Sequence, residues 1–219
     1  MFLMLTSSRR AIGAVAVLGL LAGCEVTVLD AAPPAGTAHC DAKLEGAWVA
    51  VGDSPVASAV VDDWCSAVVS GDGIPSGTRI GLRVLEDQGH WIAVEATEVE
   101  HVLPEGAAMA PVPNGSWIPL WWSRSGDGLV LGQPDARQVA TLIAMDVVDG
   151  RVACDRLTNQ VGVTDTLVNV IRPDALSQHE TLFTPSSFQL AFRRVGESMA
   201  DLEKVHKKEA AKRGSEVTP

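Results

Sequence analysis

The segment SWIPLWWSRSGDGLVLG, residues 116–132, decides the fold. The segments 116–123 and 129–132 are rich in bulky apolar residues, as in buried strands, and the Gly-Asp-Gly tripeptide between them has the composition of a tight turn. The segment therefore predicts an antiparallel hairpin. Pro119 inside the first strand favours a sheet edge or a bulge at that point, because proline cannot donate a ladder hydrogen bond.

Other segments extend this hairpin into a sheet. Residues 79–86 and 90–98 flank a second turn and predict a second antiparallel pair. Residues 44–51 predict an opening strand, and residues 188–195, where apolar and polar side chains alternate, predict a closing strand. The sequence thus predicts an α+β fold, namely a curved antiparallel β-sheet or partly closed barrel with two short helices and a C-terminal helix.

Three segments predict helices. Asp135, followed three residues later by Gln138, is typical of a helix start, and the apolar residues after it share one helical face. A second helix is favoured from Thr164, ending before Pro173, although the same residues would also serve as a strand. A C-terminal helix is expected from Ser198, as its N-cap, fraying toward the end of the chain.

The stretch 52–77 is rich in Gly, Asp, Ser and Pro. Such a composition is typical of turns and loops. We expect an irregular insertion there, with one helical turn around residues 60–69.

The N-terminal residues have the features of an export signal. Arg9 and Arg10 precede an apolar run over 11–21, which is shorter than the roughly 20 residues of a membrane-spanning helix. The run ends in Leu21-Ala22-Gly23-Cys24, which resembles the lipobox of bacterial lipoproteins. The resemblance implies cleavage before Cys24 and lipid attachment to the Cys24 sulfur. With Glu25 after the cysteine, it favours an outer-membrane anchor facing the periplasm, with the inner membrane or cell surface as alternatives.

The sequence divides the chain into four parts: a lipoprotein signal peptide (1–23), a flexible tether (24–39), a single β-rich periplasmic domain (40–196) and a helical, fraying tail (197–219). The formal net charge is −10, and it falls to −12 when the two signal-peptide arginines are removed. Such an acidic chain repels phosphate backbones, so we expect no nucleic-acid partner.

Three cysteines remain when Cys24 is set aside, in a compartment that permits disulfides. Among the possible pairings we favour Cys40–Cys65, which would join the first strand to the irregular segment after it. Free thiols at all three positions, including Cys154, stay open as an alternative. The spacing contains no metal-binding pattern, and no metal or cofactor is predicted.

Tryptophan supplies the main binding hypothesis, since the chain has six Trp and no Tyr. Residues 44–48, Leu-Glu-Gly-Ala-Trp, resemble the Gly-x-Trp opening strand of lipocalins. That resemblance implies a barrel that carries a small apolar ligand, and the candidate lining residues are Trp48, Trp91 and Trp121.

No catalytic motif occurs in the chain, so no catalytic residue is predicted. From Gly126 to the Phe-Arg-Arg-Val of 192–195, the order of elements resembles small envelope lipoproteins without established function, which implies no catalytic residues either. The first hypothesis is a non-catalytic, lipid-anchored envelope lipoprotein that binds a protein partner or supports envelope integrity. The lipocalin-like carrier is the alternative, and an enzyme acting on the cell wall is the third hypothesis.

Overall fold

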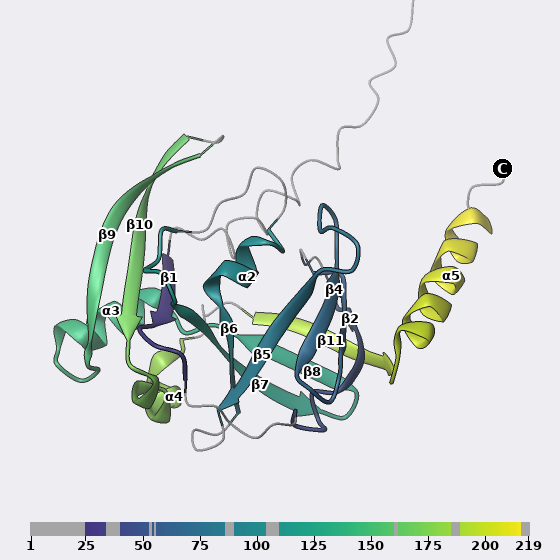
Figure 1. Cartoon of the computed structure of the whole chain (residues 1–219), viewed down its shortest axis with the longest axis horizontal. Helices are drawn as coiled ribbons and strands as arrows, with labels where there is room; N and C mark the ends of the chain where they lie inside the picture. Colours follow the sequence, from purple (N-terminus) through teal and green to yellow (C-terminus); the bar gives the residue numbers. More distant parts are fainter. Residues whose placement is uncertain are drawn as a thin grey trace, which may run out of the picture.

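Eight strands close into an antiparallel barrel (Figure 1). The computed structural model describes residues 25–33, 40–52, 54, 56–85, 90–103, 110–159, 162–184 and 189–215. The predicted signal peptide, Cys24 and residues 34–39 of the predicted tether lie outside them. Around the barrel the strands are β2 (Gly46–Ala50), β3 (Ser58–Val61), β4 (Ser66–Ser70), β5 (Arg79–Leu85), β6 (Trp91–Glu95), β7 (Trp117–Ser125), β8 (Gly128–Gly132) and β11 (Gln189–Gly196).

The barrel strands follow one another in chain order, each antiparallel to the next, and β11 closes the ring by pairing with β2. Because successive side chains of a strand point to opposite faces, every second residue faces the interior. The β-rich class and the two predicted hairpins, β5–β6 and β7–β8, are confirmed. The strand predicted over 90–98 ends at Glu95, because a helix begins at Ala96. The predicted curved sheet or partly closed barrel is a closed ring.

The stretch 52–77 is not an irregular insertion, which corrects the sequence analysis. It contains β3 and β4, and the helical turn expected around 60–69 is absent. The turn between the strands is organised by the Asp62 carboxylate, which accepts hydrogen bonds from the backbone N–H groups of Trp64 and Ser66. The stretch contains two short runs of Ala and Val between polar turns, and its overall polar composition led to the wrong prediction. These runs form strands because they pack inside the barrel.

A smaller sheet branches from the start of β7. It contains β1 (Glu25–Leu29), β10 (Gly162–Ile171) and β9 (Gly150–Asn159). β1 lies parallel to β10 and meets β7 where Leu29 faces Trp117.

Two predictions are corrected by this smaller sheet. Residues 25–29, assigned to a flexible tether, form a strand whose last four residues are buried. The helix favoured from Thr164 is the strand β10, because its run of Thr and Val pairs with a strand on each side.

The helices lie between or beyond the strands. They are α2 (Ala96–Glu100), α3 (Ala136–Ala144), α4 (His179–Leu182), α5 (Met199–Ser215) and the 3₁₀ helix η2 (Pro173–Gln178). The predicted start of α3 is confirmed: the Asp135 carboxylate accepts hydrogen bonds from the N–H groups of Arg137 and Gln138. The C-terminal helix α5 extends away from the barrel (Figure 1). Within the described residues, every helix is too short or too polar to cross a membrane.

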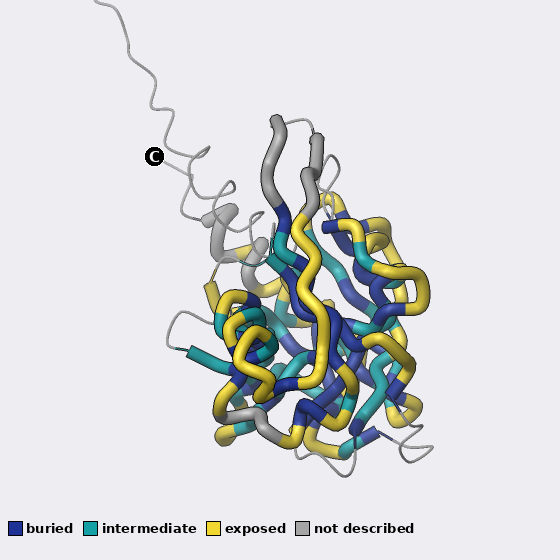
Figure 2. Tube along the Cα trace, turned by 90° about the vertical axis from the view of Figure 1, so that its left-hand side faces the viewer, coloured by how far each residue is buried: buried dark blue, intermediate teal, exposed yellow. Residues whose placement is uncertain are grey.

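Two apolar cores result. One fills the barrel and continues onto one face of β1 and β10. The other lies between the outer face of β6 and β7 and the layer formed by β1, β10, α3, η2 and α4. Figure 2 shows the buried residues gathered in the interior of the molecule and the exposed ones on its surface. The barrel core is the candidate ligand site, because all eight strands contribute to its walls.

Candidate functional site

The barrel encloses a cavity of about 110 Å³ whose walls are entirely apolar. Each of the eight barrel strands contributes at least one wall residue, which follows from the alternation of inward and outward positions. The wall residues are Leu44, Trp48, Val56, Ala59, Val61, Ala67, Val69, Ile80, Leu82, Ile92, Val94, Val99, Val102, Leu120, Leu129, Leu131, Leu190 and Phe192.

One end of the cavity is closed by Leu44 and Trp48. The Trp48 indole N–H donates a hydrogen bond to the Leu44 carbonyl at 2.8 Å. The polar atom of this buried ring therefore has a hydrogen-bond partner within the protein. Cys40 and Cys65, the pair favoured from the sequence, form a disulfide nearby, and the Cys40 N–H donates to the Asp63 carbonyl at 2.8 Å. These contacts tie the segment before β2 to the β3–β4 turn.

Helix α2 lies at the other end. Val99 on α2 and Val102 just after it face the cavity. The Glu98 carboxylate accepts a hydrogen bond from the Gly81 N–H at 2.7 Å, which fastens the helix to β5. This carboxylate therefore has a structural role.

The wall composition limits what the cavity can bind. A ligand group inside it finds no hydrogen-bond partner, so a polar group would lose its hydration without compensation. An apolar cavity of roughly 150 Å³ is enough for benzene, whereas drug-sized ligands need roughly 300 Å³ or more. The 110 Å³ cavity is smaller than both, so it suits an apolar molecule, or one apolar group, no larger than benzene.

The three tryptophans predicted to line the site are not brought together. Trp48 is a wall residue, but Trp91 and Trp121 face outward, opposite each other across β6 and β7. Both pack on Phe183, at 5.7 and 6.0 Å between ring centroids, and the Trp91 indole N–H donates to the Leu176 carbonyl. The prediction is wrong for these two residues, because both faces of β6 and β7 are buried and the sequence did not show which face turns inward.

The aliphatic wall residues were missed by sequence reasoning. Their signal was the alternation in the short strands, in which Ile92 and Val94, or Leu129 and Leu131, occupy every second position. That signal identifies one face of each strand, but it does not tell the interior of a barrel from any other core.

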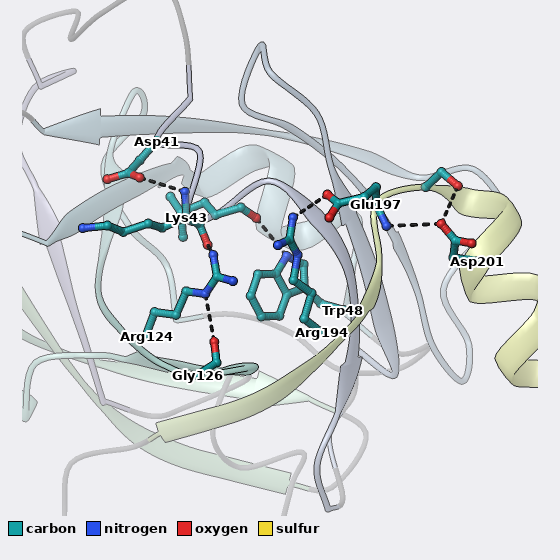
Figure 3. Close-up of polar contacts among 10 residues, drawn as sticks. Asp41, Lys43, Trp48, Arg124, Gly126, Arg194, Glu197 and Asp201 are labelled. Carbon is teal, nitrogen blue, oxygen red and sulfur yellow. Dashed lines mark hydrogen bonds and ion pairs between the residues drawn. The ribbon is translucent and has the colours of Figure 1, made fainter.

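Two arginines gather at the Trp48 end of the barrel (Figure 3). The Arg124 guanidinium lies over the Trp48 ring, 5.7 Å from its centroid, and Arg194 forms an ion pair with Glu197. Gly46 makes room for Arg194: a Cβ added at Gly46 would lie 2.7 Å from the Arg194 Nε, and its φ of +121° disfavours other residues. The glycine of the Gly-x-Trp sequence is thus required for packing against Arg194.

The described residues contain no group of three or more His, Cys, Asp or Glu side chains placed to hold a metal ion. Cys154, on β9, is an exposed free thiol.

The fold and the cavity together define the class of protein: an eight-stranded, up-and-down antiparallel β-barrel with an apolar interior. No family model matches the chain, and no curated protein or solved structure is detectably similar to it. The fold and the apolar cavity are therefore the basis for assigning a function.

Proposed function

We propose that this chain is a lipid-anchored envelope protein that carries a small apolar ligand inside its barrel. The observation that carries the proposal is the cavity lined only by apolar side chains from all eight strands. A hydrophobic interior of this kind stabilises a bound apolar group by removing its surface from water, at roughly 25 cal/mol per Å². The reaction class is binding, and the proposal assigns no catalytic residue.

The anchor in this proposal is a lipid on Cys24, in the outer membrane and facing the periplasm. It rests on the Leu-Ala-Gly-Cys sequence of residues 21–24 and the apolar run before it. Two or more acyl chains on one protein give stable membrane attachment, whereas one chain gives only marginal binding. An anchored barrel could accept apolar molecules that leave the bilayer.

Ligand carriage is tested by native mass spectrometry of a soluble form that begins at Glu25. It must begin there because β1 belongs to the sheet. We expect a mass adduct that disappears in Ala59→Leu, since Ala59 is a wall residue and the larger side chain fills the cavity. A clean apo mass, unchanged after incubation with small apolar compounds, would contradict the carrier proposal.

Lipid attachment is tested separately by labelling cells with a palmitate analogue. Cys24→Ser should abolish labelling and leave the precursor unprocessed, while Cys154→Ser should not alter either. Normal labelling of the Cys24→Ser variant would remove the anchor from the proposal and leave ligand carriage untouched.

A second candidate function, binding of a protein partner in the envelope, is favoured by one observation. β9 pairs with β10 on one side and lies at the end of the sheet among the described residues. Residues 151–154 are exposed, and an exposed edge strand can pair with an extended segment of another protein. Val152→Lys should reduce in-cell cross-linking to such a partner without changing the ligand adduct.

A further inference from the structure

We infer that a recess at the Trp48 end of the barrel is a binding site for a small oxyanion, a phosphate or carboxylate group. The recess has a volume of about 330 Å³ and is lined by Lys43, His90, Trp122, Arg124 and Gly126. None of these residues lines the apolar cavity, so the site is additional to ligand carriage in the barrel.

Arg124 is the fixed cation of the recess. Its Nε donates a hydrogen bond to the Gly126 carbonyl at 3.2 Å, and one terminal nitrogen donates to the Lys43 carbonyl at 3.1 Å. Figure 3 shows the guanidinium between these two carbonyls and beside the Trp48 ring. Backbone carbonyls orient the guanidinium without cancelling its charge, so the positive charge remains available to a ligand.

Arg194 differs from Arg124 in having a carboxylate partner. Arg194 lies at the same end of the barrel, but the Glu197 carboxylate forms an ion pair with it. Neither Arg124 nor Lys43 forms an ion pair with a carboxylate in the described part of the chain. Two cations without a carboxylate partner among the described residues therefore line one recess of a chain whose net charge is −10, where they attract an anion.

Trp122 supplies a second, independent observation. Its side chain is 2% exposed, it lines the recess, and its indole N–H has no hydrogen-bond acceptor among the described residues. A buried donor without an acceptor destabilises the fold, because it has lost its hydrogen bonds with water. The proposed anion lies beside this ring and gives Lys43 and Arg124 a counter-charge.

His90 forms another wall of the recess. Its ring lies 4.7 Å from the Trp122 ring, centroid to centroid, and its carbonyl accepts the Trp122 backbone N–H at 2.8 Å. An imidazole ring carries an N–H donor, and His90 brings this ring to the lining of the recess. The Asp41 carboxylate accepts the backbone N–H of Lys43 at 2.8 Å and opposes anion binding by its charge.

Titration with inorganic phosphate tests the site directly. The full chain, isolated in an uncharged detergent, is followed by NMR of its tryptophan indole N–H groups at constant ionic strength. We expect the Trp122 signal, identified by its absence in Trp122→Phe, to shift with phosphate. Lys43→Gln should weaken binding about tenfold, because it removes a charge-assisted hydrogen bond from the site.

Matched variants separate a built site from general charge effects. Arg124→Gln should also weaken binding, and Asp41→Asn should strengthen it by removing the opposing charge. Lys208→Gln makes the same charge change as Lys43→Gln on exposed α5 and should leave binding unchanged. An unshifted Trp122 signal at saturating phosphate, or equal weakening by Lys208→Gln, would overturn the inference.

The same titration identifies the source of the anion. If phosphatidylglycerol added to the micelles displaces phosphate from the Trp122 signal, the site accepts lipid headgroups. If only soluble phosphate esters such as glycerol 3-phosphate displace it, the site serves soluble anions. Both results uphold the oxyanion site and differ only in what fills it.

Discussion

Glu25 forms an ion pair with Arg137 of α3, with 2.7 Å between the Glu25 Oε1 and the Arg137 Nη2. The Glu25 carboxylate also accepts hydrogen bonds from the guanidinium, and these raise the pKa of Arg137 above its ordinary value. Glu25 is the residue that follows the proposed lipid site at Cys24. A lipid on Cys24 would therefore hold the folded sheet close to the bilayer instead of on a long tether.

The strand β1 gives the first prediction. Leu29 is fully buried and belongs to the outer core. Leu29→Ala should lower the free energy of unfolding by about 2–5 kcal/mol, because it opens a cavity in that core. A flexible tether would lose almost nothing, so urea unfolding of the soluble form distinguishes the two descriptions. Arg137→Gln, which removes only an exposed ion pair, is the control and should shift the midpoint little.

The disulfide gives the second prediction. Cys40 and Cys65 are 25 residues apart, and closing a loop of that length stabilises the fold by about 3 kcal/mol through the unfolded chain. Replacing both cysteines by Ala should lower the free energy of unfolding by about that amount. Cys154→Ala is a matched control because its thiol is free and exposed. Equal stability of the double variant and the parent would show that the bridge contributes little.

Sequence reasoning succeeded where a local pattern decides the structure. The Gly-Asp-Gly turn places β7 beside β8, and Asp135 begins α3, because turn and capping chemistry depend on neighbouring residues. It failed where partners distant in the chain decide. Residues 25–29 look like a linker until β10 pairs with them, and residues 164–171 fit a helix until strands flank them.

Some residues of the candidate site could be predicted from local sequence, and others could not. Trp48 could be identified from its opening strand, but the outward direction of Trp91 and Trp121 depends on which strand face the barrel turns inward. The oxyanion recess combines the segment before β2, the start of β6 and the end of β7. These three segments are distant in the chain and share no local motif, so the sequence alone could not predict that they come together.

The start of α5 gives a prediction about pH. The Asp201 carboxylate accepts hydrogen bonds from Lys204, the Ser198 hydroxyl and the Glu197 N–H, which lower its pKa to about 2. Its contribution to stability is therefore present above the ordinary pKa near 4 and is lost as the pH falls toward 2. The Glu197 amide signal in NMR should shift with a midpoint near pH 2. A midpoint near 4 would contradict the contacts, and Asp201→Asn should remove the transition.

The two tryptophan environments give a paired prediction. Trp91→Phe leaves the Leu176 carbonyl without its donor and should cost about 1–3 kcal/mol of stability while ligand binding in the barrel is unchanged. Trp48→Phe alters a wall of the cavity and should change binding. Urea unfolding and the native mass spectrum of each variant measure the two effects. Loss of the adduct in Trp91→Phe alone would place the ligand in the outer core.

The most direct test of ligand carriage is a benzene titration followed by methyl NMR of the soluble form beginning at Glu25. We predict saturable shifts for the cavity methyl groups of Leu82, Leu120 and Leu131, with none for the outer-core leucines Leu29 and Leu176. Ala59→Leu should abolish the shifts. Unshifted cavity methyl groups, or equal shifts in both cores, would contradict the proposal that the barrel interior is the binding site.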